Sequence, residues 1–422
     1  MNILLNHISQ LATRNSQLAI SGSKSETNRL LLLQALYPNL TLENTSNSDD
    51  SEVMTKALQN SQLATRNSQL IDVHHAGTAM RFLTAYFSIQ ENREVVLTGS
   101  SRMKERPIGI LVDALRQLGA EISYEENEGF PPIRIKGKKL TRNKVSLAAN
   151  VSSQYISALL LIAPKLGNGL ELTLEGEITS IPYIKMTVAL LNEIGVETLF
   201  KNNIISVTPK FVIRNSKFVI ESDWSSASYF YSIVALSAIG TQITLSNYKE
   251  NSLQGDSALV EIYKNFGVET IFNNNKSITI TKINNSQLET FNSQLNNSPD
   301  IAQTIAVTCF GLGIGCHLTG LHTLKIKETD RLLALQNELE KLGGQVSITD
   351  ESLTLKPANN IRSGIKIKTY QDHRMAMAFA PLALKVPVII EDAAVVSKSY
   401  PSFWEDLKAI GFQMEQIDYL EK

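Results

Sequence analysis

The stretch KETDRLLALQNELEKLGGQV, residues 327–346, combines the two features around which this chain of 422 residues is organised. From residue 332 it has a helix-like apolar stripe that ends in Gly and then becomes a β-like run. Gly suits a helix end because it adopts a left-handed backbone at little cost. The pattern recurs at 111–122, 187–198 and 259–270, in shorter form at 406–414, and without its Gly at 53–62. About six copies at a spacing of roughly 60–70 residues are too far apart for a solenoid, and they predict six βα-type units in two similar domains.

The second feature is the set of charges at residues 327–331, between a β-like run (318–326) and the helix-like stripe. This order predicts a strand-to-helix junction, where free N–H groups and the helix dipole favour an anion. Lys327 and Arg331 are four residues apart, so we expect them to share a helix face, with Glu328 between them. One acid between two bases suits an anion that must be both held and protonated. Taken alone, however, the stretch favours an ordinary solvated ion-pair cluster.

Composition excludes several classes of function. The chain is 43% hydrophobic and 19% charged, which indicates about two or three domains with buried cores. A net charge of −1 gives no general attraction for nucleic acid or an acidic membrane. No run reaches the ~18 apolar residues of a membrane span, and residues 1–10 lack a secretory pattern, so we expect a cytoplasmic protein. Cys309 and Cys316 lie in an apolar run and are expected to be buried, and no His spacing predicts a metal.

A second repetition is of another kind. SQLATRNSQL occurs identically at 9–18 and 61–70, and NSQL recurs at 285–288 and 292–295. Identity without drift suggests repeated DNA captured in loops, so we expect exposed insertions without function.

Several helix-like runs begin with residues that favour anions, at 21–36, 74–87, 101–115, 150–163, 298–310 and 370–384. Pro107 suits the first helical position of the third run, and Ser152 or Ser153 suits the cap of the fourth. GLGIG (311–315) follows a helix-like run, which favours a helix-ending turn over a dinucleotide fingerprint. If these helix starts face one cleft, their dipoles add to the side-chain charges and create an anion-selective site.

Basic side chains cluster in these junctions beside Ser and Gln rather than acidic partners, which indicates an oxyanion cage. They are Lys24, Arg29, Arg81, Arg102, Lys104, Arg106, Lys327, Arg331, Arg374 and Lys398. Each alone is more often a solvated surface charge. Asp300 and Glu328 lie at two of the junctions, where nearby cations would keep one carboxylate ionised as a base while the other shuttles a proton.

GSKS, AGTAMR, RMKERP, SSQY, PDIA, KETDRL, DHRMAM and SKSYP occur in this order along nearly the whole chain. Together these motifs resemble those of the 5-enolpyruvylshikimate-3-phosphate (EPSP) synthase family of enolpyruvyl transferases. The resemblance implies an α/β fold of two similar inside-out barrel domains, each of three βαβαββ units, with the active site in the interdomain cleft. It also implies a discontinuous domain, 1–21 plus 223–422, and an inserted domain, 22–222.

The resemblance implies transfer of an enolpyruvyl group from phosphoenolpyruvate to shikimate 3-phosphate by a monomer, without cofactor or metal. By similarity, Asp300 is the base, Glu328 the acid, and Lys24 a catalytic lysine that bridges both substrates. The residues expected to bind shikimate 3-phosphate are Lys24, Ser25, Arg29, Ser152, Ser153, Gln154, Ser180, Tyr183, Asp300, Thr323 and Lys327. Those expected to bind phosphoenolpyruvate are Lys24, Gly77, Arg106, Gln154, Arg331, Arg374 and Lys398.

Three positions depart from the usual family pattern: His75 and Thr323 replace Asn, and Phe82 replaces Pro. Two other functions remain open. A related transferase acts on UDP-N-acetylglucosamine, but a loop cysteine is expected there, whereas both cysteines here lie in an apolar run. A catalytically silent anion-binding homologue is the other alternative, and the presence of Asp300 and Glu328 argues against it.

Overall fold

The computed structural model describes residues 1–8, 11, 14–60, 69–150, 152–209 and 212–417. The chain divides into two compact units, which we call the terminal unit (Met1–Ser21 with Glu221–Lys422) and the inserted unit (Gly22–Ile220). The second crossing between them lies at 220/221, two residues before the expected 222/223. Both units are mixed α/β structures, as the sequence predicted.

Within the described residues, the terminal unit has three four-stranded sheets, each made of a parallel pair of strands extended by two antiparallel strands. Their strands, in spatial order, are β14 (Val268–Phe272), β15 (Ile278–Lys282), β13 (Gln242–Leu245) and β2 (Arg14–Leu18); β16 (Thr290–Gln294), β17 (Gly315–Thr319), β19 (Leu353–Leu355) and β18 (Val346–Ile348); and β20 (Ile365–Ile367), β21 (Val388–Ile390), β1 (Asn2–Leu5) and β22 (Met414–Ile417). Each sheet belongs to one βαβαββ unit, and the start of the chain supplies the last strand of the third.

The inserted unit repeats this design twice and then in reduced form. Its strands are β4 (Gln69–Asp72), β5 (Glu94–Thr98), β7 (Ile133–Lys136) and β6 (Glu121–Tyr124); β10 (Thr198–Lys201), β11 (Ile204–Val207), β9 (Leu170–Glu175) and β8 (Lys144–Ala148); and the parallel pair β12 (Lys217–Val219) and β3 (Thr41–Glu43). The third unit has no hairpin in the part of the chain that the structure describes, which ends at residue 60 there and resumes at 69. The terminal unit therefore contains all three of the expected βαβαββ repeats.

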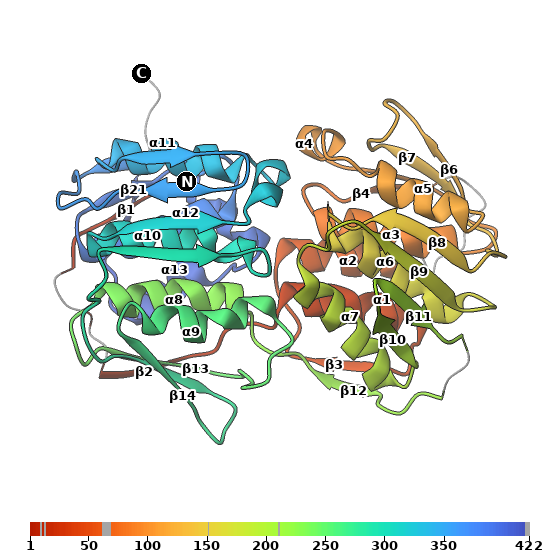
Figure 1. The fold of residues 1–422 in the computed structure, drawn as a ribbon, viewed down its shortest axis with the longest axis horizontal. Coiled ribbons are helices and arrows are strands. Elements are labelled where there is room, and N and C mark those ends of the chain that lie inside the picture. Colours follow the sequence, from red (N-terminus) through yellow and green to blue (C-terminus); the bar gives the residue numbers. More distant parts are fainter. Residues whose placement is uncertain (9–10, 12–13, 61–68, 151, 210–211, 418–422) are drawn as a thin grey trace. The chain divides into compact units, whose positions relative to one another are not determined.

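The first helix of each βαβαββ unit packs inside, and the sheets lie outside (Figure 1). These inner helices are α8 (Trp224–Leu236), α10 (Ala302–Leu312) and α12 (His373–Phe379) in the terminal unit, and α1 (Lys24–Leu36), α3 (Gly77–Ser88) and α6 (Ser153–Ile162) in the inserted unit. Every residue of α12 is buried. Buried hydroxyl groups on neighbouring helices bond to each other, as Ser232 and Thr308 do at 2.8 Å, so polar residues fit inside the core. Cys309 and Cys316 are buried, as expected.

The second helix of each unit lies beside its sheet and, in five units, is followed by the Gly that the sequence pattern identified. These helices are α2 (Asp49–Asn60), α5 (Gly109–Gln117), α7 (Ile181–Ile194), α9 (Leu259–Lys264), α11 (Arg331–Lys341) and α13 (Phe403–Ala409). Gly195 (φ 108°) and Gly343 (φ 104°) show the left-handed backbone that stops the helix. Short helices complete the fold: α4 (Ser101–Lys104), η1 (Ala163–Lys165), η2 (Gly255–Ala258), η3 (Pro299–Ile301), η4 (His322–Ile326), η5 (Ala380–Leu384) and η6 (Ala393–Lys398). None of the described helices is long and apolar enough to span a bilayer.

Two local predictions were wrong. The run 318–326 is a strand only as far as Thr319, and the η4 turn follows it, so α11 begins at Arg331 and Lys327 lies outside the helix. Lys327 and Arg331 therefore do not share a helix face. Pro107 is not the first residue of a helix either, because it lies between α4 and α5, where its carbonyl accepts a 2.6 Å hydrogen bond from Tyr155. GLGIG ends α10 at Gly313, as predicted.

The repeated NSQL sequences are only partly in loops. Residues 9–10, 12–13 and 61–68 of the ten-residue repeats lie outside the described residues. Leu18 at the end of the first copy is buried, and strand β2 there pairs with β13. The second copy ends in β4, and residues 292–294 belong to β16, whereas 285–288 form a loop. The prediction of exposed insertions was therefore wrong for 14–18, because these residues complete a sheet.

Candidate active site

The terminal unit gathers most of its predicted site residues around the Arg331 guanidinium. Arg331 is 2% exposed, and its three nitrogens bond to three different carboxylates. Nε donates to Asp372 at 2.6 Å, and Nη1 and Nη2 donate to Asp300 and Glu328 at 2.8 Å each. Asp330 caps α11 and so fixes the helix start from which Arg331 projects. The acid–base pair proposed from the sequence, Asp300 and Glu328, is thus held by one cation.

Asp300 lies among three cations. Besides Arg331, the carboxylate is 3.4 Å from the Lys327 ammonium and 3.5 Å from Nη2 of Arg374. Burial favours the neutral acid, but Lys327, Arg374 and Arg331 outweigh it and hold the pKa of Asp300 well below its usual range. Asp300 is therefore an ionised carboxylate whose basicity depends on how much of this positive charge remains unneutralised.

Arg374 also contacts a second pair of side chains, Ser225 and Asp256. Its Nη2 donates to the Ser225 hydroxyl at 3.3 Å, and Ser225 in turn donates a short hydrogen bond to Asp256. Asp256 is 2% exposed. Burial, partly offset by Arg374, raises the pKa of Asp256 to about 6. The starts of α8, α10 and α12 thus meet at one place, because Ser225, Asp300 and Arg374 belong to them or directly precede them.

Two predicted residues of the terminal unit lie at the edge of this cluster. Nζ of Lys398 donates to the backbone carbonyl of Gln371 at 2.7 Å, one residue before Asp372. Thr323, in η4, is buried, and its hydroxyl makes no hydrogen bond within the described residues. A buried hydroxyl without a partner is costly, so Thr323 is suited to receive a polar ligand group.

In the inserted unit, Lys24 begins α1 and lies 3.1 Å from the carboxylate of Asp50 at the start of α2. Both side chains are mostly buried, at 18% and 12% exposure. Ser23 caps α1, so Lys24 and Ser25 occupy the first helical turn, where free N–H groups favour an anion.

The starts of α3 and α6 lie next to each other. The Gln154 side-chain amide donates to the Thr78 hydroxyl at 3.1 Å, which joins the two helix starts. The Arg106 guanidinium packs over Gly77 so closely that an added Cβ there would be 2.6 Å from its Nη1. Only Gly permits this approach, and Nε of Arg106 has no hydrogen-bond partner among the described residues. Arg106 and Gln154 are therefore placed over adjacent positive helix ends.

Ser152 and Ser180 begin two other helices of the inserted unit. Ser152 caps α6 by accepting from the Gln154 N–H at 3.3 Å, as the sequence predicted, and Ser153 is the first helical residue. Ser180 precedes α7 in a left-handed conformation (φ 55°), and its hydroxyl makes no capping bond. Tyr183 lies in the first turn of the same helix.

Arg29 has a position that the sequence did not suggest. It is 2% exposed and braces α1 against α6 and α7, donating to Thr187 at 2.7 Å, Ser157 at 3.0 Å and two backbone carbonyls. Burial lowers the pKa of Arg29 to about 10. The Phe82 ring, one of the family departures, lies under the guanidinium at 5.4 Å. In this structure the donors of Arg29 are thus directed at the protein interior.

The acid-free cage expected from the sequence was wrong. Lys24, Arg102, Lys104 and Arg331 each form an ion pair with a carboxylate: Asp50, Glu105, Glu126, and the trio around Arg331, respectively. Sequence reasoning missed both Asp50 and Asp372 as partners, although Asp372 lies at the start of the helix-like run 370–384. Both aspartates directly precede or begin a helix, which was the available signal, but nothing local shows that they reach a distant cation.

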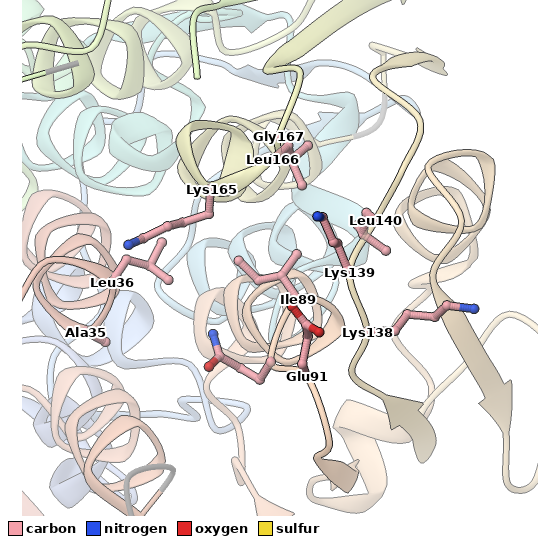
Figure 2. A pocket seen from close by; sticks show the side chains of 11 residues that line it. Ala35, Leu36, Ile89, Glu91, Lys138, Lys139, Leu140, Lys165, Leu166 and Gly167 are labelled. Atoms are coloured by element: carbon pink, nitrogen blue, oxygen red, sulfur yellow. The ribbon is translucent and has the colours of Figure 1, made fainter. Parts of the chain in front are cut away.

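A cavity in the inserted unit supports the placement of its helix starts. A cavity of about 390 Å³ in the inserted unit is lined by Leu36, Ile89 and Lys165, which lie at or just beyond the carboxyl ends of α1, α3 and α6 (Figure 2). Because these helices pack side by side and end together, their amino ends also gather, about 15–20 Å away. The charged side chains that line this cavity are Lys138, Lys139, Lys165 and Glu91, and the Lys165 ammonium lies 4.2 Å from the Tyr37 ring centroid.

Comparisons with known proteins agree over nearly the full length. The model of the EPSP synthase (3-phosphoshikimate 1-carboxyvinyltransferase) family matches residues 39–407. The 3-phosphoshikimate 1-carboxyvinyltransferase of Bacteroides fragilis (strain YCH46) is 44% identical over 416 residues, 98% of both chains. That of Haemophilus influenzae (strain Rd) is 35% identical, over 93% of this chain and 95% of its own. The EPSP synthase structure from Acinetobacter baumannii has a TM-score of 0.77 at 20% identity, covering 98% and 99%. The enolpyruvyl transferase NikO from Streptomyces tendae has a TM-score of 0.73 at 14% identity, covering 98% of each chain.

Proposed function

Because the chain belongs to the EPSP synthase (3-phosphoshikimate 1-carboxyvinyltransferase) family, we propose that it transfers the enolpyruvyl group of phosphoenolpyruvate to the 5-hydroxyl of shikimate 3-phosphate. Inorganic phosphate is the second product, and the reaction belongs to the shikimate pathway toward chorismate and aromatic amino acids. The observation that carries the proposal is the bonding of Asp300 and Glu328 to one guanidinium, each at 2.8 Å. We take Asp300 as the proton acceptor, Glu328 as the proton donor and Arg331 as part of the anion clamp.

The reaction proceeds by addition and then elimination. In the addition, Glu328 protonates the methylene carbon of phosphoenolpyruvate, and the central carbon becomes cation-like. The 5-hydroxyl oxygen bonds to that carbon while Asp300 takes its proton. In the elimination, Glu328 recovers a proton from the new methyl group and the carbon–oxygen bond to phosphate breaks. Phosphate leaves with the proton that Asp300 accepted, and the enolpyruvyl ether remains.

Charge neutralisation explains how Asp300 becomes a base. Without substrate, Lys327, Arg374 and Arg331 hold its pKa low, which makes it a poor proton acceptor. The phosphate and carboxylate of phosphoenolpyruvate bind Arg331, Arg374 and Lys398, and their negative charge offsets the guanidinium charges that face Asp300. The pKa of Asp300 then rises toward the value that proton transfer requires. Substrate binding thus activates the base.

The inserted unit supplies the other contacts. The gathered starts of α1, α3 and α6 favour anions, and Lys24, Gly77, Arg106 and Gln154 are assigned to phosphoenolpyruvate there. The phosphate of shikimate 3-phosphate is assigned to Ser152, Ser153, Gln154, Ser180 and Tyr183. Lys24, Ser25 and Arg29 are assigned to the same substrate, and Arg29 contacts the backbone carbonyls of Ser25 and Tyr183. Lys327, Thr323 and Asp300 contact the ring hydroxyls.

Phosphate release from phosphoenolpyruvate tests this proposal. The protein should release phosphate with shikimate 3-phosphate and not with UDP-N-acetylglucosamine; the opposite result would assign it to the other transferase, and no release with either would indicate a silent homologue. Asp300→Ala and Glu328→Gln should each lower kcat by about 10²–10⁴-fold with modest loss of binding. Glu340→Gln, at an exposed site on the same helix as Arg331, is the matched control and should keep normal turnover.

A further inference from the structure

Glu338 is a buried carboxylate with no place in the mechanism above. It lies on α11, two turns after Arg331, and is 0% exposed. Its two oxygens accept from the Tyr370 hydroxyl at 2.6 Å, the Lys368 backbone N–H at 3.1 Å, and the Lys341 ammonium at 2.7 and 2.8 Å. Two of these three donors belong to one segment, residues 368–372, which leads from β20 into α12. Glu338 thus ties this segment to α11.

The segment needs such a tie because its backbone is strained. Tyr370 and Gln371 both have positive φ, at 54° and 57°. Two consecutive side-chain-bearing residues in the left-handed region are disfavoured, and they persist only where the surroundings fix them. The Tyr370 hydroxyl bonds to Glu338, and the Lys368 ammonium lies 5.4 Å from the Tyr370 ring centroid. Glu338 therefore accepts hydrogen bonds from both Lys368 and Tyr370, the first residue of the segment and the first residue of the strained turn.

The strained turn supplies the groups that contact Lys398, Arg331 and Arg374. The Gln371 carbonyl accepts from Lys398, and the Asp372 carboxylate accepts from Nε of Arg331. Asp372 also accepts from the Arg374 backbone N–H at 2.9 Å and so sets the first turn of α12. A shift of residues 370–372 would move all of these contacts together.

We propose that Glu338 is a positioning residue for phosphoenolpyruvate: by holding the turn at 368–372, it fixes Arg331, Arg374 and Lys398 relative to one another. The inference rests on the function proposed above, since it takes these cations as the phosphoenolpyruvate clamp. α11 and the turn are then joined twice, by Arg331 with Asp372 near the substrate and by Glu338 with Tyr370 two helical turns away. The contact between Glu338 and Tyr370 keeps Asp372 in the position where it binds Arg331.

A purely structural role makes a different prediction. If Glu338 only paired with Lys341, or only stabilised the core, its loss would lower the stability of the terminal unit and leave substrate affinity unchanged in the folded protein. Positioning instead predicts a selective loss, in KM for phosphoenolpyruvate and in inhibition by inorganic phosphate, because both anions need the clamp. Most of the residues assigned to shikimate 3-phosphate lie in the inserted unit, so its binding should change little.

The test compares Tyr370→Phe, Glu338→Ala and Glu338→Gln with Tyr263→Phe. Tyr370→Phe removes one hydroxyl and keeps the ring, so it is the variant least expected to impair folding. Tyr263→Phe is the matched control, because that buried hydroxyl in the same unit bonds Thr308 at 2.9 Å, away from the turn. We expect Tyr370→Phe and Glu338→Ala to raise KM for phosphoenolpyruvate about tenfold or more, with KM for shikimate 3-phosphate within about twofold of the original. Glu338→Gln keeps an acceptor oxygen and should retain part of the affinity.

An unchanged KM for phosphoenolpyruvate in both Tyr370→Phe and Glu338→Ala would overturn the inference, as would an equal rise in the control. Titration of each variant with phosphoenolpyruvate by calorimetry, without shikimate 3-phosphate as the acceptor, gives a readout that does not depend on turnover. If the unmutated protein binds phosphoenolpyruvate but forms no product, the proposed reaction fails while the positioning role is still decided by these affinities. If phosphoenolpyruvate does not bind the unmutated protein at all, both proposals fail.

Discussion

Asp372 accepts a 2.6 Å hydrogen bond from Nε of Arg331, and the two side chains are 0% and 2% exposed. The pair joins the start of α12 to the start of α11, across 41 residues of sequence. The pair therefore holds the two helix starts at a fixed distance from each other.

Asp372→Asn should destabilise the terminal unit strongly, because it leaves a buried guanidinium with one carboxylate fewer. Breaking a buried ion pair by changing one partner costs about 3–5 kcal/mol. Both tryptophans, Trp224 and Trp404, lie in the terminal unit, so urea unfolding followed by tryptophan fluorescence reports on that unit. Asp350→Asn is the control, since that carboxylate pairs with Lys325 at an exposed site and its loss should leave the transition in place. Equal curves for Asp372→Asn and the unmutated protein would contradict the assigned pairing.

Asp300 should make the terminal unit sensitive to acid. Although burial opposes it, Lys327, Arg374 and Arg331 lower the pKa of Asp300 below the ordinary 3.8. A carboxylate whose folded pKa is depressed stabilises the fold above its unfolded pKa, and this stabilisation is lost as pH falls below about 4 toward the folded pKa. Asp300→Asn should therefore cost more unfolding free energy at pH 7 than at pH 3. Tryptophan-monitored unfolding at both values checks this, and a pH-independent difference would argue against an ionised, cation-bound Asp300.

Asp256 should behave in the opposite sense. Burial, partly offset by Arg374, raises the pKa of Asp256 from 3.8 to about 6, so the folded protein holds the proton more tightly than the unfolded chain. The penalty for ionising Asp256 is absent below about pH 4 and fully present above pH 6, where it reaches about 3 kcal/mol. Relative to the unmutated protein, Asp256→Asn should gain stability as pH rises from 4 to 8. An unchanged difference, or a relative loss of stability, over that interval would show that burial does not raise the pKa of Asp256.

Arg29→Met should destabilise the inserted unit, because the Thr187 and Ser157 hydroxyls and two carbonyls would lose a buried donor. Unpaired buried groups of this kind cost roughly 3 kcal/mol together. Hydrogen exchange of α1, α6 and α7 measures the effect, since both tryptophans lie elsewhere. The exposed Arg142→Met, in the same unit, should leave exchange unchanged. Normal protection in Arg29→Met combined with weak binding of shikimate 3-phosphate would assign Arg29 to the substrate rather than to the fold.

The repeated architecture was predictable because its signals are local. A Gly such as Gly195 or Gly343 ends a helix through its own backbone conformation, and Ser152 caps α6 through the next turn. These signals placed most of the helices and the six-fold repetition. The run before Lys327 was assigned to a strand because short apolar runs look alike in strands and in 3-10 turns.

The ion-pair partners that lie far apart in the chain were not predictable from the sequence. Asp372 reaches Arg331 across 41 residues, and Asp50 reaches Lys24 across 26, so no local pattern connects them. The cations therefore looked free of acids in the sequence, whereas burial in the folded protein requires that they be paired. Glu338 was missed for the same reason, since its position within a helical stripe says nothing about the turn that it contacts.

The placement of β1 has a consequence for synthesis. Asn2–Leu5 pairs with β21 on one side and with β22, Met414–Ile417, on the other, so the first strand of the chain completes a sheet whose other members are made last. On the ribosome, the inserted unit has all of its residues long before that sheet can form. Asn2–Leu5 therefore lacks its partner strands until residues 388–417 have been made, and a nascent chain stalled before residue 414 would hold a complete inserted unit and a terminal unit with one sheet unfinished.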